Sequence, residues 1–131
     1  INMISCGGQA SIPMAVAISK VHNDIEYIEV VSSIASKSAG PATRLNLDEY
    51  IKTTEGGVKY FSGAKKTKAI LVLNPATPSV NMVTTILAKV KNPNIEALKK
   101  EVDILVKKVQ SYVPGYELIL GPLFENGRIV I

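Results

Sequence analysis

The chain has 131 residues and a mass of 14.1 kDa, which suits one domain and leaves no room for two hydrophobic cores. Hydrophobic residues make up 47% and charged residues 20%, a balance that is typical of folded globular proteins and argues against disorder. The net charge of +4 includes only two arginines, Arg44 and Arg128, so no nucleic-acid-binding surface is expected. No apolar run reaches the roughly 20 residues of a membrane-spanning helix, so no membrane contact is predicted.

The cysteine count and the two ends of the chain set further expectations. A single cysteine excludes an intrachain disulfide, and a reduced, cytoplasmic setting is the simplest interpretation. One cysteine and one histidine make a metal site unexpected. The chain starts at Ile1 and stops within the apolar run 128–131, so we interpret residues 1–131 as one domain of a longer protein.

Taken in chain order, the patterns predict an α/β (α+β) fold with a mixed sheet of about six strands layered with about three helices. A short strand at 2–4 and a tight turn with Cys6 come first, and a helix is expected to start near Pro13, because proline suits a first turn. Residues 37–44 are expected to form a loop. Further strands are predicted at 25–34, 69–73 (buried), 80–91, 116–120 and 128–131, and helices at 48–61 and 94–113.

Cys6 is the strongest candidate for chemistry. It precedes two glycines and a helix N-terminus, where unpaired backbone N–H groups favour the reactive thiolate. The same N–H groups are suited to hold the oxyanion of a tetrahedral thiohemiacetal. The alternative is a small buried cysteine that only packs.

His22 and residues 37–46 are weaker candidates, because each also has an ordinary structural explanation. His22 lies 16 positions after Cys6, so a helix would carry it roughly 20 Å away, and an exposed position at the helix end is expected rather than a role as the base. Residues 37–46 offer small polar groups and Arg44, which suits phosphate, but they match no nucleotide-binding fingerprint. An ordinary Gly-Pro turn is the alternative there.

Four segments carry a resemblance to a known family. Residues 2–14 (NMISCGGQASIPM) resemble the active-site segment of acylating acetaldehyde dehydrogenases, the CoA-dependent enzymes that follow an aldolase in meta-cleavage catabolic pathways. The resemblance continues in the same order through residues 33–44, 71–76 and 113–116. It therefore spans nearly the whole chain.

The resemblance implies a fold similar to the catalytic domain of glyceraldehyde-3-phosphate dehydrogenases. It also implies that Cys6 attacks acetaldehyde, passes hydride to NAD and holds a thioester that coenzyme A resolves, without a metal. A homodimer through this domain and a 4-hydroxy-2-oxovalerate aldolase partner that delivers acetaldehyde are further implications. The residues implied to contact NAD are Ser38, Ala39, Gly40, Pro41, Ala42, Thr43, Arg44, Leu45 and Asn46.

Departures from the family's pattern keep alternatives open. The family's N-terminal NAD-binding domain is absent, so this chain alone is not expected to turn over. Thr84 stands where many members have an acidic residue, and Ala42 stands where a glycine is usual. A non-catalytic dimerisation or aldolase-docking module is the main alternative. A related phosphate-using dehydrogenase is disfavoured, because such enzymes use a catalytic histidine and more arginine.

Overall fold

The computed structural model describes residues 5–131, and the strand predicted at 2–4 lies outside them. Over the described residues the mixed α/β class is confirmed, with a five-stranded sheet in the order β2-β1-β3-β5-β4 rather than about six strands. The strands are β1 (Ile25–Ala35), β2 (Lys66–Asn74), β3 (Val83–Val90), β4 (Leu123–Glu125) and β5 (Arg128–Val130). The helices are α1 (Cys6–Val21), α2 (Pro41–Leu45), α3 (Leu47–Ser62) and α4 (Ile95–Gln110), with a 3₁₀ turn at Ser36–Ser38.

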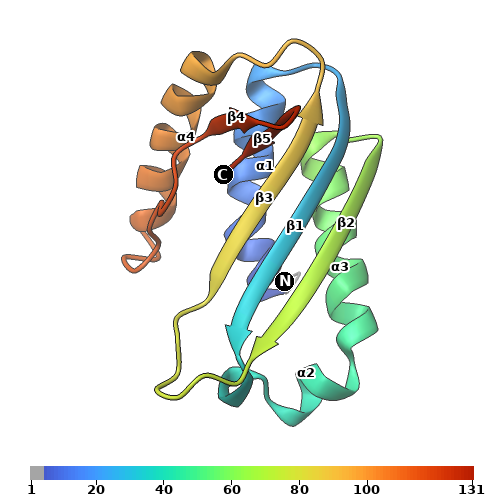
Figure 1. Cartoon of the computed structure of the whole chain (residues 1–131), viewed down its shortest axis with the longest axis vertical. Coiled ribbons are helices and arrows are strands. Elements are labelled where there is room, and N and C mark those ends of the chain that lie inside the picture. The colour runs from blue at the N-terminus through green and yellow to red at the C-terminus, as the bar shows by residue number, and fades with distance from the viewer. Residues whose placement is uncertain (1–4) are drawn as a thin grey trace.

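The sheet has one covered face and one open face. Figure 1 shows α1, α3 and α4 behind the sheet, while no helix or strand of residues 5–131 covers the face turned towards the viewer. Strand β1 pairs in parallel with β2 and antiparallel with β3. Side chains alternate between the faces of a strand, so Ile28, Val30 and Ile34 of β1 are buried under the helices. The core is aliphatic, as the scarcity of aromatic residues indicates.

Helix α1 starts earlier than the sequence suggested. Cys6 is its first residue, and Pro13 lies inside it, so the expectations of a start near Pro13 and of a turn holding Cys6 are wrong. The reason is the N-cap, because the Ser5 hydroxyl accepts a hydrogen bond from the Gly8 N–H at 3.1 Å. Serine is among the preferred residues at this position. Ser11, Ala15, Ala17 and Ile18 are fully buried, so packing holds the helix together around its proline.

The strand predictions at the edges of the sheet need two corrections. Residues 69–73 lie in β2, an edge strand in which only Ala69 is buried, so the expectation of full burial is wrong. Residues 116–120 form no strand. The chain instead makes a hairpin of β4 and β5, whose two central residues Asn126 and Gly127 both have positive φ angles, of 49° and 76°. Asn-Gly is the favoured pair for such a turn.

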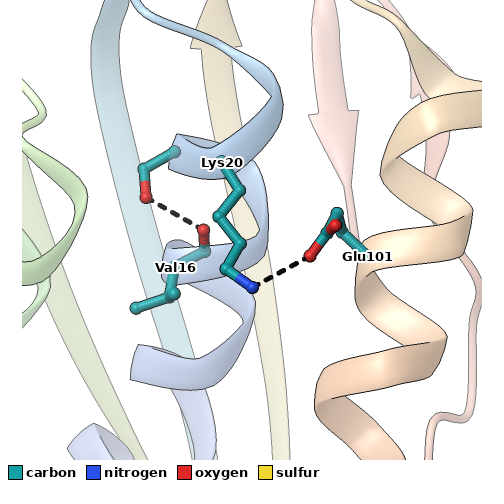
Figure 2. A network of polar contacts seen from close by, with 4 residues as sticks. Val16, Lys20 and Glu101 are labelled. Carbon is teal, nitrogen blue, oxygen red and sulfur yellow. Dashed lines mark hydrogen bonds and ion pairs between the residues drawn. The ribbon is translucent and has the colours of Figure 1, made fainter.

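Polar contacts join α1 to α4 at the end far from Cys6. The Lys20 ammonium lies 3.1 Å from the Glu101 carboxylate, as Figure 2 shows. His22 is buried, not exposed as expected: its Nδ1 donates to the Ile18 carbonyl at 3.0 Å, and its Nε2 accepts from the Asn94 N–H at 3.0 Å. It therefore connects the end of α1 to the start of α4. No helix within residues 5–131 is long and apolar enough to cross a membrane.

Candidate active site

Cys6 is exposed at the N-terminus of α1, so the alternative of a buried packing cysteine is wrong. The N-cap uses the Gly8 N–H, and the N–H groups of Cys6 and Gly7 lie outside the helical ladder. The partial positive charge of this helix end is therefore directed at the sulfur. The sulfur is thus placed beside backbone N–H donors.

A second helix fixes the position of this N-terminus. The Ser5 hydroxyl lies 2.5 Å from the Thr54 hydroxyl of α3, and Thr54 in turn donates to the Tyr50 carbonyl at 2.8 Å. One turn earlier in α3, the Tyr50 hydroxyl lies 3.7 Å from the Cys6 sulfur. Two contacts from α3 therefore hold the first turn of α1, one on its cap and one on its thiol.

Gly7 is required because Tyr50 occupies the space where a side chain would lie. A Cβ at Gly7 would be 2.2 Å from the Tyr50 hydroxyl oxygen and 3.1 Å from the Ser32 hydroxyl. Ser32 is buried and lies 3.0 Å from the hydroxyl of Thr84, the residue at which a departure from the family's pattern is expected. Thr84 thus contacts the polar side chain that lies beside Gly7.

An apolar cavity of about 440 Å³ opens beside Cys6. Its wall includes the segment after α4, which is fastened to α1 by the Tyr116 hydroxyl, a donor to the Ala10 carbonyl at 2.8 Å. Burial raises the pKa of Tyr116 to about 12, so this hydroxyl keeps its proton at neutral pH. The cavity is suited to a small apolar group attached to the sulfur. Other residues that line it are Gln9, Ile12, Met82, Val109, Tyr112 and Val113.

The segment implied to contact NAD follows β1 in the chain. Figure 1 places α2 below the C-terminal end of β1. Residues 38–46 are mostly exposed, but they form the end of a 3₁₀ turn and α2 rather than the expected loop. The Arg44 guanidinium donates to the Ser36 carbonyl at 2.6 Å and to the Ala39 carbonyl at 3.1 Å. Arg44 therefore orders its own segment.

Sequence reasoning missed the residues that surround Cys6. Tyr50 is 44 positions away and carries no local signal, since only the packing of α3 on α1 brings it to the thiol. Ser32 and Thr84 come from adjacent strands for the same reason. Ser5 had a signal that went unused, because serine just before a helical segment is typical of an N-cap.

The chain is similar to a known family of prokaryotic domains. A family model described as prokaryotic acetaldehyde dehydrogenase, dimerisation, matches residues 6–131, so the chain is of the class of dehydrogenase dimerisation domains. An acetaldehyde dehydrogenase of Pectobacterium atrosepticum is 60% identical over 130 residues, which are 99% of this chain and 44% of that protein. One of Spirochaeta aurantia is 60% identical over 131 residues, 100% of this chain and 44% of that protein. The chain belongs to the prokaryotic acetaldehyde dehydrogenase family, and it spans 44% of the length of these relatives.

Proposed function

We propose that this chain is the catalytic-cysteine and dimerisation domain of an acylating acetaldehyde dehydrogenase, which converts acetaldehyde, NAD and coenzyme A to acetyl-CoA and NADH. One observation carries the proposal: the exposed Cys6 thiol lies at the N-terminus of α1 and lines an apolar cavity. The family assignment agrees with it.

The residues of this chain suit each step that requires a protein group. The Cys6 thiolate attacks the aldehyde carbon and forms a carbon–sulfur bond, and the carbonyl oxygen becomes an oxyanion. The Cys6 and Gly7 N–H groups are suited to stabilise this oxyanion. When bound, NAD accepts the hydride from the former aldehyde carbon, and coenzyme A takes the acyl group. Cys6 is then released as the thiolate.

Some of residues 38–46 are exposed and could contact NAD, and others are not. Gly40, Pro41 and Ala42 are exposed where α2 begins, below the C-terminal end of β1, whereas Ala39 is buried. Because the Arg44 guanidinium is held by carbonyl oxygens of its own segment, we expect this segment to present backbone and small side chains to NAD. The aldolase partner stays a prediction from the family resemblance.

The open face of the sheet is the surface that we propose for dimerisation, with a second copy of this chain as the occupant. Its apolar side chains are half-buried or exposed, and Val72 is 43% exposed. Both charges occur on this face, with Lys66 and Lys68 of β2 next to Glu29 of β1, so two copies related by a two-fold axis can pair opposite charges. The other apolar side chains on the face include Val31, Ile70, Leu87 and Val130.

Trapping of the acyl group on Cys6 tests the enzymatic proposal. The protein that carries this chain is incubated with acetaldehyde and NAD in the absence of coenzyme A, and the peptide with Cys6 is then examined by mass spectrometry. We expect an acetyl group on Cys6, its removal on addition of coenzyme A, and no acetylation in Cys6→Ala. Absence of the acetyl group in a folded protein that binds NAD would favour a non-catalytic assembly module.

Sedimentation analysis tests the dimer surface. Val72→Asp places a charge on the open face, and we expect it to weaken the dimer. Ile104→Asp is the matched control, because Ile104 of α4 is an exposed apolar residue on the other side of the molecule, 55% exposed. A dimer that is unchanged by Val72→Asp, or weakened equally by both variants, would contradict the assignment of this face.

A further inference from the structure

The hydroxyl of Tyr50 is held against the Cys6 sulfur by a constrained local arrangement. The distance between Tyr50 Oη and Cys6 Sγ is 3.7 Å, within the range of a hydrogen bond to sulfur. Tyr50 is half-buried, and its hydroxyl fills the space that Gly7 leaves open. The contact between Ser5 and Thr54, at 2.5 Å, fixes the spacing of the two helices one turn away. The ring therefore has little freedom to turn away from the thiol.

The direction of this hydrogen bond depends on the state of Cys6. While Cys6 is a thiol, its S–H donates to the phenol oxygen. Once Cys6 is a thiolate it can only accept, and the phenol O–H is the donor that lies beside it. A hydrogen bond to an ionised partner is stronger than one between neutral groups. The contact therefore favours the ionised sulfur over the neutral one.

We propose that Tyr50 donates a hydrogen bond to the Cys6 thiolate and so increases the thiolate fraction and fixes the direction of the sulfur towards the cavity. The inference rests on the proposed function, in which Cys6 is the nucleophile, and it assigns a second residue to that site. Tyr50 acts on the sulfur and not on the aldehyde.

The protonation state of Tyr50 agrees with a donor role. Burial of the ring is the largest cause, and the hydrogen bond to Cys6 the second largest, of a rise in the pKa of Tyr50 to about 12. The phenol therefore carries its proton throughout the pH range in which thiols ionise. Contacts of the phenol oxygen with Ser32 and with the Gly7 backbone act in the opposite direction and are smaller.

The test is the pH dependence of alkylation of Cys6 by iodoacetamide, followed on the Cys6 peptide by mass spectrometry. The unsubstituted protein is compared with Tyr50→Phe, which keeps the ring and removes the hydroxyl. Tyr112→Phe is the matched control, since Tyr112 also lines the cavity beside Cys6 and the substitution likewise removes one phenol hydroxyl. For Tyr50→Phe we expect the midpoint of the profile to rise by about one pH unit, an approximately tenfold loss of thiolate below the midpoint.

The plateau at high pH separates this role from a structural one. There every sulfur is ionised, so the rate in Tyr50→Phe should equal or exceed that of the unsubstituted protein, because a less stabilised thiolate is more nucleophilic. An unshifted midpoint in Tyr50→Phe, or equal shifts in both variants, would overturn the inference. The function would still stand if the unsubstituted protein keeps a low midpoint and forms the acetyl-Cys6 adduct. A profile like that of a free thiol in the unsubstituted protein would overturn both.

Discussion

Replacement of Gly7 by alanine is the substitution whose effect the structure determines most closely. The new Cβ would lie 2.2 Å from the Tyr50 hydroxyl oxygen, whereas real Cβ atoms essentially never come within 3.0 Å of another heavy atom. Either the ring or the first turn of α1 must move by most of an ångström. Alanine favours a helix over glycine by about 1 kcal/mol, but overpacking costs about 1–3 kcal/mol. The two effects together leave an expected loss of up to about 2 kcal/mol in the free energy of unfolding of Gly7→Ala.

The same distances predict that removal of one oxygen relieves this loss. With phenylalanine at position 50 the contact at 2.2 Å is gone, and the nearest atoms are the ring carbon Cζ and the Ser32 hydroxyl, both at 3.1 Å. Such contacts are tight but can be relieved by shifts of a few tenths of an ångström. In the Tyr50→Phe background we therefore expect Gly7→Ala to cost less than about 1 kcal/mol.

Urea unfolding of four proteins measures this coupling as a double-mutant cycle: the unsubstituted protein, the two single variants and the double variant. The coupling energy is expected to be about 1 kcal/mol or more, with the double variant more stable than the sum of the single effects predicts. Effects that add to within about 0.5 kcal/mol would refute the argument, because the clash with the hydroxyl would not be the cause of the loss.

Three further predictions concern other parts of the fold. Gly56→Ala should raise the free energy of unfolding by about 0.5–1 kcal/mol in urea unfolding, because Gly56 lies in a helix with open space around it; Gly57→Ala should gain less, since its Cβ would lie 2.9 Å from an Ile12 methyl carbon. Two lysine partners lower the pKa of Asp24 from 3.8 to about 2; Asp24 therefore contributes stability above pH 4 that is lost as the pH falls towards 2, and the difference in unfolding midpoint between the protein and Asp24→Asn should shrink over that range. His22→Ala should lower the free energy of unfolding by about 1–3 kcal/mol, because it removes a buried side chain and leaves the N–H at the start of α4 without its partner, while the Ile18 carbonyl keeps the backbone N–H of residue 22.

Helices α3 and α4 and the central strands were predicted from the sequence because their apolar spacing is regular, whereas α2 lies where a loop was expected. Strand 25–34 and helix 48–61 differ from β1 and α3 by only one residue at the ends. The start of α1 was not predicted, because a cap at Ser5 and burial of the helix outweigh the local preference of Pro13. The exposure of β2 was not predicted either. A short apolar run is typical of a buried strand, and only the order of the strands in the sheet shows that β2 lies at an edge.

In the candidate site, too, the residue identified by its local sequence was predicted and the residues from distant parts of the chain were not. Cys6 could be singled out because its neighbours in sequence, two glycines and a helix, are also its neighbours in space. No local pattern indicates Tyr50, which approaches from another helix, or the hydrogen bond between Ser32 and Thr84 across two strands. The exposed position expected for His22 was wrong because counting along a helix measures distance from Cys6 but not burial.

Half of the 16 residues of α1 are buried, and this helix packs against α3, α4 and the two central strands. Its backbone amides should therefore be among the slowest to exchange with deuterium, opening only when the whole domain unfolds. Cys6 is itself a residue of this helix, so the position of its thiol depends on the position of the helix. The position of the thiol is therefore lost only when the whole domain unfolds. Local opening elsewhere leaves the thiol in place, and a destabilising substitution lowers the fraction of folded molecules without changing the reactivity of each folded molecule.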